Sequence, residues 1–275
     1  MAQEPRAREG LDTLLRALKL PIFVELRASL AARAETEGWR FEEYLHQLAT
    51  HEAQDRKRRR IDRLVKLSGV PKDKTLAALK LDRLSTPVRR LLPTLCEGGF
   101  VERAENVLAF GLPGRGKTHV LCAIANELLL RGYKVLFTPA YRLVQRLLVA
   151  KRALALEREL RALDAFDVVA IDDIGYIQQD REEMEVLFTF LAERYERRSV
   201  MISSNLVFSQ WDRIFKDPMT TAAAIDRIVH HAVILEMNGR SYRDDEAGER
   251  LGIAPPPVER DTSNSTLAPQ SERNA

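Results

Sequence analysis

The stretch that most limits how this sequence can fold is the octet Gly-Leu-Pro-Gly-Arg-Gly-Lys-Thr at residues 111–118. It matches the pattern G-x-x-x-x-G-K-[ST] at every fixed position. A short apolar run of strand type, 106–110, precedes it, and apolar residues at helical spacing, 119–128, follow it. In this context glycines let backbone N–H groups approach an anion at a helix N-terminus, which predicts a phosphate-binding loop. A plain glycine-rich turn is the alternative, and both flanks disfavour it.

The loop also predicts which residues hold the ligand. The Lys117 side chain can reach the β- and γ-phosphates of a nucleoside triphosphate, and the Thr118 hydroxyl can hold Mg²⁺. The cofactors that we expect are therefore ATP and Mg²⁺. We expect the nucleotide to contact the residues of the loop and the one after it: Gly111, Pro113, Gly114, Arg115, Gly116, Lys117, Thr118 and His119.

A second motif lies at residues 166–173, which read Phe-Asp-Val-Val-Ala-Ile-Asp-Asp. Its four apolar residues predict a buried strand with two acids at the carboxyl end, where open parallel sheets bind ligands. Asp172 is placed to hold Mg²⁺, directly or through water, and Asp173 to polarise the attacking water. An apolar run that ends in acids is common on its own, but the upstream phosphate loop favours the catalytic interpretation.

The next strand candidate, residues 199–205, ends in Asn205. If it neighbours the Asp172 strand, Asn205 lies near the γ-phosphate and can orient the water; a turn-capping asparagine is the alternative. From residue 107 onward, strand and helix patterns alternate with short links, which predicts an α/β fold with a parallel sheet flanked by helices. Residues 140–165 form one or two helices whose basic face is either solvated or part of a nucleic-acid path.

The amino-terminal third predicts a small all-helical domain at residues 1–66. Three segments in it have the apolar spacing or charge pattern of helices, and we expect the helices at 11–20, 22–35 and 41–60. The ATPase domain is expected at 67–253. Its first part, 67–105, carries three leucines that could pack on the rest of the domain: Leu76, Leu79 and Leu81. Residues 254–275 contain three consecutive prolines and few apolar residues, so we expect a disordered tail.

Five consecutive basic residues lie near the end of the helical domain: Arg56, Lys57, Arg58, Arg59 and Arg60. Such a run repels itself unless counter-charges lie nearby. We interpret it as a contact for DNA phosphates, and a solvated helix face is the alternative. The formal net charge of the chain is only +3, so bulk charge does not point to nucleic acid.

Composition excludes several other classes of protein. With 45% hydrophobic and 30% charged residues, the chain resembles an ordinary soluble globular protein. The two cysteines, Cys96 and Cys122, form neither a metal-ligand pattern nor a disulfide framework, and we expect Cys122 in the core. No apolar run approaches the ~18 residues of a membrane span, and the start lacks the apolar segment of a signal peptide. We therefore expect a cytoplasmic protein without membrane contact.

Taken in order, these motifs resemble one family. The octet and the acidic strand are followed by Ser-Ser-Asn at 203–205 with Phe-Ser-Gln-Trp at 208–211, by Asp-Arg-Ile at 226–228, and by Gly-Arg-Ser-Tyr-Arg at 239–243. Together they resemble the IstB-like transposition helper ATPases, relatives of the DnaC helicase loaders in the AAA+ superfamily. The resemblance covers roughly residues 10–253. It implies an AAA+ P-loop fold and a homo-oligomer on duplex DNA with ATP between subunits. It also implies that the protein remodels the duplex and recruits and stimulates an IstA-like transposase.

The resemblance further implies roles for single residues. Those named above are the Walker A ligands Lys117 and Thr118, the Walker B acids Asp172 and Asp173, and the sensor 1 residue Asn205. Arg227, which we expect to be exposed, is the arginine finger that reaches the γ-phosphate of a neighbouring subunit, and a salt bridge to a nearby acid is the alternative. Arg243 is the sensor 2 candidate, and Arg240 competes with it.

One departure from the wider superfamily affects the expected rate. Many members carry Asp-Glu where this chain has Asp172 and Asp173. The shorter second carboxylate reaches less far toward the water, so we expect slow hydrolysis. Two other functions stay open at this point. One is a DnaC-like helicase loader, and the other is an ATP-dependent scaffold that never contacts DNA.

Overall fold

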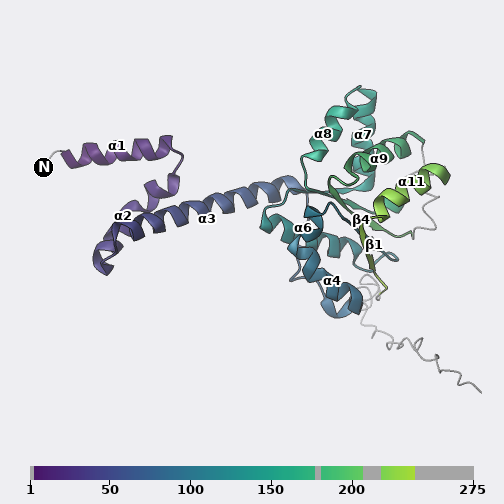
Figure 1. Ribbon diagram of the computed structural model, residues 1–275, viewed down its shortest axis with the longest axis horizontal. Helices are drawn as coiled ribbons and strands as arrows, with labels where there is room; N and C mark the ends of the chain where they lie inside the picture. Colours follow the sequence, from purple (N-terminus) through teal and green to yellow (C-terminus); the bar gives the residue numbers. More distant parts are fainter. Residues whose placement is uncertain (1–2, 177–180, 207–217, 239–275) are drawn as a thin grey trace, which may run out of the picture.

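The computed structural model describes residues 3–176, 181–206 and 218–238 (Figure 1). The helices of the amino-terminal part are α1 (Gln3–Ala17), α2 (Pro21–Glu37), α3 (Phe41–Ser68), α4 (Thr86–Glu97) and α5 (Gly99–Glu102). The later helices are α6 (Lys117–Arg131), α7 (Ala140–Arg152), α8 (Leu156–Asp164), α9 (Arg181–Arg194) and α11 (Pro218–Val229). The strands are β1 (Asn106–Phe110), β2 (Val135–Pro139), β3 (Val168–Asp172), β4 (Ser199–Ser204) and β5 (Ala232–Glu236).

The strands form one sheet with the order β2-β3-β4-β1-β5, and each neighbouring pair is parallel. The carboxyl ends of the strands therefore meet at one edge of the sheet. Because β4 lies between β3 and β1, the acids after β3, the end of β4 and the loop after β1 are neighbours. This confirms the predicted parallel sheet, and it meets the condition on which the placement of Asn205 rested.

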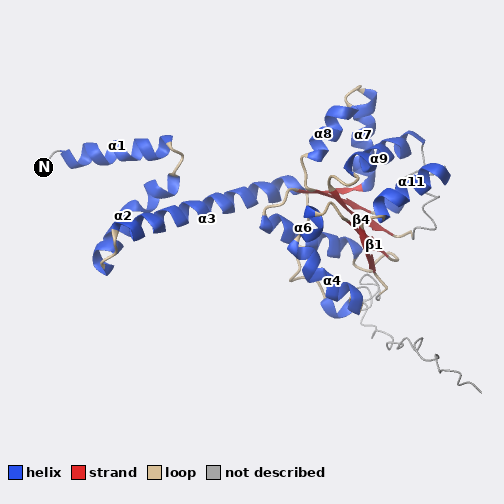
Figure 2. Cartoon of the chain, viewed as in Figure 1, coloured by secondary structure: helices blue, strands red, loops and turns tan. Residues whose placement is uncertain are grey.

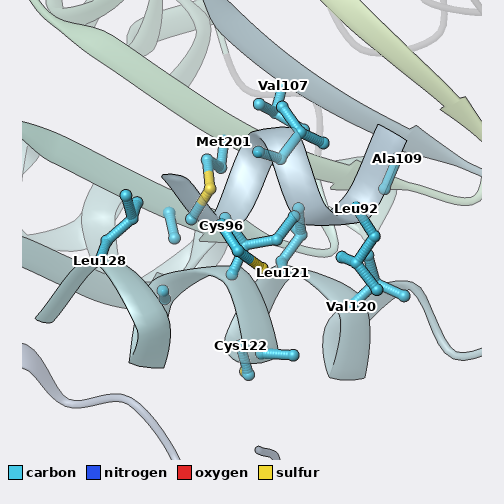
Figure 3. Packing of buried hydrophobic residues seen from close by; sticks show 14 of the residues in the cluster. Leu92, Cys96, Val107, Ala109, Val120, Leu121, Cys122, Leu128 and Met201 are labelled. Carbon is cyan, nitrogen blue, oxygen red and sulfur yellow. The ribbon is translucent and has the colours of Figure 1, made fainter. Parts of the chain in front are cut away.

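Both faces of the central strands β1, β3 and β4 are buried, as expected for parallel strands covered by helices on each side (Figure 2). In β1, Val107 and Ala109 face the helices α4 and α6, whereas Leu108 and Phe110 belong to the core beneath α7 and α9. Figure 3 shows the first of these cores, where α4 and α6 pack over β1 and β4. The Cys122 side chain is fully buried, and burial raises the pKa of its thiol to about 12. Cys122 is thus the core residue that the sequence predicts.

Helix α3 is a single helix of 28 residues that projects away from the sheet and carries α2 and α1 at its far end (Figure 1). The predicted end at residue 60 is therefore wrong, since the helical spacing of apolar residues continues through Leu64 and Val65. These two side chains pack against the core under α6. The predicted boundary at residue 66 falls in the last turn of this helix and stays a prediction.

The segment between α3 and β1 packs on the core under α4 and α6 through two of its three candidate leucines. Leu79 is buried and Leu76 is half-buried, both against the same core. Leu81 is 45% exposed at the start of a short 3₁₀ turn, so its predicted packing is wrong. No helix in the described ranges is both long and apolar enough to cross a bilayer.

A buried arginine, Arg194 at the end of α9, holds the amino ends of β3 and β4 in place. Its guanidinium donates to four backbone carbonyls at 2.9–3.2 Å, those of Leu163, Phe166, Asp167 and Ser199. Burial lowers the pKa of Arg194 to about 10, with the Asp164 carboxylate as a smaller opposing influence. The guanidinium is therefore charged at neutral pH, and the dipoles of the four carbonyls stabilise its charge.

Candidate nucleotide-binding site

The phosphate loop has the backbone that its sequence predicts. Gly116 takes a left-handed conformation, with φ 83°, directly before the first residue of α6. Gly111 has φ 152°, and a Cβ there would lie 2.5 Å from the carbonyl oxygen of Met237. The start of the loop therefore lies directly against the backbone of the segment after β5. Only glycine, which has no Cβ, fits at position 111.

Lys117 begins α6 and is almost fully buried, with 5% of its surface exposed. Its ammonium donates to the carbonyl oxygens of Gly111 and Leu112, at 2.7 and 3.0 Å. The charge thus lies within the loop, against the backbone that cradles the phosphates in proteins with this motif. A phosphate bound here would offer the ammonium charged oxygens in place of these neutral acceptors.

Thr118 and Asp172 lie together, although 54 residues separate them in the chain. The Thr118 hydroxyl donates to Asp172 Oδ1 and Oδ2, at 2.8 and 3.1 Å. A hydroxyl and a carboxylate are hard oxygen ligands of the kind that Mg²⁺ prefers. The residues present therefore fit a magnesium ion. Both were predicted from the sequence as its ligands.

Ser203 is a third member of this group, and no role was predicted for it from the sequence. Its hydroxyl is fully buried, donates to Asp172 Oδ1 at 2.6 Å and accepts from the Asp173 N–H at 2.8 Å. The pairing of Ile171 with Ile202 explains this, because it sets the next residues of β3 and β4 side by side. The proximity of Ser203 to Asp172 therefore depends on the strand order, which no local pattern predicts.

Asp173 has φ 56°, a left-handed conformation that is uncommon for a residue with a side chain. Such strain is often found at functional positions, where the surrounding structure enforces it. A pocket of about 440 Å³ opens beside it, lined by Pro139, Tyr141, Asp172 and Asp173. Both acids therefore border a space at the carboxyl edge of the sheet, next to the phosphate loop.

Asn205 follows β4 and lies against the turn that follows the acids. Its Oδ1 atom is buried and has no hydrogen-bond partner among the described residues. The same atom lies so close to Gly175 that a Cβ on Gly175 would be only 2.1 Å from it. The side chain thus stands at the same edge as Asp172 and Asp173, and its role in orienting water stays a prediction.

Two other predicted site residues have partners that the sequence did not show. The His119 ring contacts the carbonyl oxygen of Thr75 at 3.1 Å, which ties α6 to the segment before α4. Arg227 is half-buried on α11, and its guanidinium carbon lies 4.9 Å above the ring centre of Phe188 on α9. The expected full exposure of Arg227 is therefore wrong, because α11 packs against α9. Arg240, Arg243 and the 208–211 motif lie outside the described residues.

The basic run lies in the second half of α3, and Arg60 at its end donates to the Gly132 carbonyl at 3.2 Å, directly after α6. Two acids of the preceding turn supply the counter-charge that the run requires. Asp55 accepts from Arg58 and Arg59, at 2.5 and 2.7 Å, and the buried Glu52 accepts from Arg56 at 2.8 Å. Two acids against five bases leave the run with a positive charge, which is compatible with DNA binding. No contact with DNA is shown, so DNA binding stays a prediction.

Comparison with known sequences gives consistent relatives. The family model described as "IstB-like ATP binding protein" matches residues 13–249. An insertion sequence ATP-binding protein of Sinorhizobium fredii is 41% identical over 240 residues, which cover 87% of this chain and 80% of the relative. The IS5376 ATP-binding protein of Geobacillus stearothermophilus is 34% identical over 236 residues, with 86% and 94% covered.

Solved structures agree on the fold. DnaA from Aquifex aeolicus bound to AMPPCP has a TM-score of 0.50 and 17% identity, covering 69% of this chain and 59% of that one. DnaI has a TM-score of 0.51 and 22% identity, covering 62% and 95%. At these identities the likeness shows the AAA+ P-loop fold alone. The family match over most of the chain is decisive: this protein belongs to the IstB-like ATP binding protein family.

Proposed function

We propose that this protein is an ATP-dependent transposition helper. It binds and hydrolyses ATP with Mg²⁺, and it assembles on duplex DNA as a homo-oligomer with ATP between adjacent subunits. It remodels the duplex, and it recruits and stimulates an IstA-like transposase. The observation that carries the proposal is the pair of hydrogen bonds from Thr118 to Asp172, which joins the phosphate loop to the acidic strand. The names of the insertion sequence relatives support the biological setting.

The roles of the residues follow from their positions. Lys117 turns from its loop carbonyls to the β- and γ-phosphates, and the N–H groups at the start of α6 bind the same oxygens. Thr118 and Asp172 hold Mg²⁺, which when bound supplies positive charge for the charge that develops on the phosphates. Asp173 polarises the attacking water, and Asn205 orients it. Slow turnover suits a protein whose ATP-bound assembly is the working state.

Arg227 completes the site of a neighbouring subunit in this proposal. Its guanidinium Nη1 is buried and has no hydrogen-bond partner within the described part of the chain. The face of Phe188 supports the cation without using a donor, so Nη1 is the donor that we assign to a phosphate. Arg243 remains our candidate for a second contact with the nucleotide.

The central test is assembly of the Lys117→Ala variant on duplex DNA with ATP and Mg²⁺, followed by analytical ultracentrifugation. We expect the parent protein to form a large DNA-bound complex and the variant to remain unassembled, because the loop has lost its phosphate-binding charge. Lys72→Ala, at an exposed lysine outside the loop, is the matched control and should assemble normally. Normal assembly of the Lys117 variant would remove the phosphate loop from the proposal.

DNA contact through α3 needs its own test, because its arginines already have partners. Lys57→Glu with Arg58→Glu reverses two exposed charges without touching the buried Glu52. If both contact phosphates, the slope of log K against log salt should fall by about 2. Arg33→Glu with Arg40→Glu makes the same charge change elsewhere in the helical part and should leave the slope unchanged. Equal slopes in all three proteins would favour a scaffold that does not use this surface.

The choice of partner separates the helper from a helicase loader. Pull-down of the full chain with an IstA-like transposase and, in parallel, with a replicative helicase tests both at once. Retention of the transposase alone, with stimulation of its strand transfer, is the expected result. Retention of the helicase alone would replace the transposition role with helicase loading and leave the nucleotide site as described.

A further inference from the structure

A second cluster of potential ligand side chains lies at the edge of the sheet opposite to the nucleotide site. Glu196 is in the turn between α9 and β4, and His230 and His231 form the turn between α11 and β5. Ligand atoms of all three lie within 4.8 Å of one another, and all three side chains are exposed. The sheet order brings them together, since only β1 lies between β4 and β5.

The backbone holds both turns firmly at this edge. The Asn106 N–H, at the start of β1, donates to the carbonyl oxygen of His231 at 2.7 Å. The Asn106 side chain donates to the Ile228 carbonyl at 2.9 Å and accepts from the Val200 N–H at 3.0 Å. One buried asparagine thus fixes the turn before β5 relative to the start of β4. The three candidate ligands stand on anchored backbone.

The side chains are already oriented toward one another. His231 Nε2 lies 3.7 Å from Glu196 Oε1, and the two imidazole rings are 4.2 Å apart at an angle of 61°. The Tyr195 hydroxyl lies 3.2 Å from His230 Nδ1. Contacts of this kind at one ring nitrogen orient a histidine so that the other nitrogen can bind a metal.

We propose that His230, His231 and Glu196 form a binding site for one divalent ion of the zinc class. Two imidazoles and a carboxylate are ligands that Zn²⁺ takes at about 2.0–2.2 Å, with water in the fourth position. Tetrahedral ligands of such an ion lie about 3.4 Å apart. The exposed side chains reach that spacing by small rotations, without disturbing the core. Mg²⁺, which prefers oxygen ligands, does not compete here.

A bound ion joins the turn after α9 to the turn after α11. Arg227 lies one helical turn before His231 on the same segment, so the ion restrains the helix end that carries it. The site is separate from the phosphate loop, and the proposal stands whether or not the protein hydrolyses ATP. The competing explanation is a plain ion pair between His231 and Glu196, which needs no metal.

The test is titration of the full chain, without nucleotide and without a polyhistidine tag, with ZnCl₂ by calorimetry in the presence of excess Mg²⁺. Co²⁺ is a second probe, because its visible absorption reports tetrahedral nitrogen and oxygen ligands. We expect one ion per chain, and at least a tenfold loss of affinity in His231→Gln, His230→Gln and Glu196→Gln. His46→Gln, at an exposed histidine of α3, is the matched control and should bind as the parent does. Circular dichroism checks that each variant is folded.

Each outcome decides the proposal. Loss of binding in all three variants but not in the control supports the three-ligand site, as does slower amide exchange at residues 226–231 with Zn²⁺ in the parent alone. Parent-like affinity in any one ligand variant overturns the site as stated. Absence of binding by the parent protein up to millimolar Zn²⁺ leaves the ion pair as the explanation.

Discussion

Replacement of Ser203 by alanine tests whether this buried hydroxyl positions the magnesium ligand. The change removes the donor to Asp172 Oδ1, at 2.6 Å, and the acceptor of the Asp173 N–H, at 2.8 Å. A hydrogen bond to a charged group contributes about 1.5–3 kcal/mol, and a buried N–H without a partner costs about 1–3 kcal/mol. The two losses are not additive, so we expect destabilisation by about 2–4 kcal/mol.

The larger expected effect is on the requirement for Mg²⁺. Groups that orient a metal ligand typically change metal affinity by about 10–100-fold when they are removed. Without Ser203, the Asp172 carboxylate keeps the Thr118 hydroxyl as a donor, and the Asp173 N–H loses its hydrogen bond to the Ser203 hydroxyl. The Mg²⁺ concentration that gives half-maximal ATP hydrolysis should therefore rise about 10–100-fold. Binding of ATP measured without Mg²⁺ should change little, because the phosphate loop is untouched.

Ser199→Ala is the matched control, since Ser199 is equally buried at the other end of β4 and its hydroxyl makes a long contact, 3.4 Å, to the Phe100 carbonyl. It should lower the melting temperature slightly and leave the Mg²⁺ dependence unchanged. If folded Ser203→Ala protein keeps the parent's Mg²⁺ dependence, the hydroxyl is structural and the positioning role is refuted.

Three further changes test separate parts of the structure. Gly175→Ala puts a methyl group where Asn205 Oδ1 lies, 2.1 Å from the new carbon, so hydrolysis should fall about 10²-fold while ATP binding persists; Gly10→Ala, in open space, should be silent. Arg227→Ala should lower turnover by about 10³-fold or more in the assembled protein with ATP affinity nearly intact, whereas Phe188→Leu, which removes only the supporting ring, should keep most of the activity. Arg194→Met should lower the free energy of unfolding by about 3–5 kcal/mol in urea, because the carbonyls that it binds lose their donor. An unchanged value for Gly175→Ala, Arg227→Ala or Arg194→Met contradicts the role assigned to that residue.

Local patterns were sufficient to predict the parallel sheet and to name candidate site residues at its carboxyl edge. The octet and the acidic strand are local motifs, so they identified Lys117, Thr118 and Asp172 as candidates directly. The structure brings the last two within hydrogen-bonding distance. The alternation of strand and helix predicted a parallel sheet. Short links let each helix cross over the sheet, and such crossovers join parallel strands with right-handed connections. These features depend on residues that are close together in the chain.

Features that depend on contacts between distant segments could not be predicted. Ser203 gained its role from the register between β3 and β4, which no local pattern specifies. Arg227 was expected in solvent, since its own helix gives no sign that Phe188 lies beneath it. The end of α3 was placed too early because charged residues dominate that stretch, while two apolar residues, Leu64 and Val65, continue the helix into the core.

Helix α6 connects the two surfaces that the proposed function requires. Its first residue is Lys117 of the phosphate loop, and Gly132, directly after its last turn, accepts a hydrogen bond at 3.2 Å from Arg60 of the basic run. Along its length, Asn126 donates to the carbonyl oxygen of Lys74, in the segment that follows α3. Through these contacts, one buried helix joins the phosphate loop to the base of α3. We therefore expect nucleotide and DNA affinity to be linked through α6, with equal and reciprocal effects on the two binding free energies.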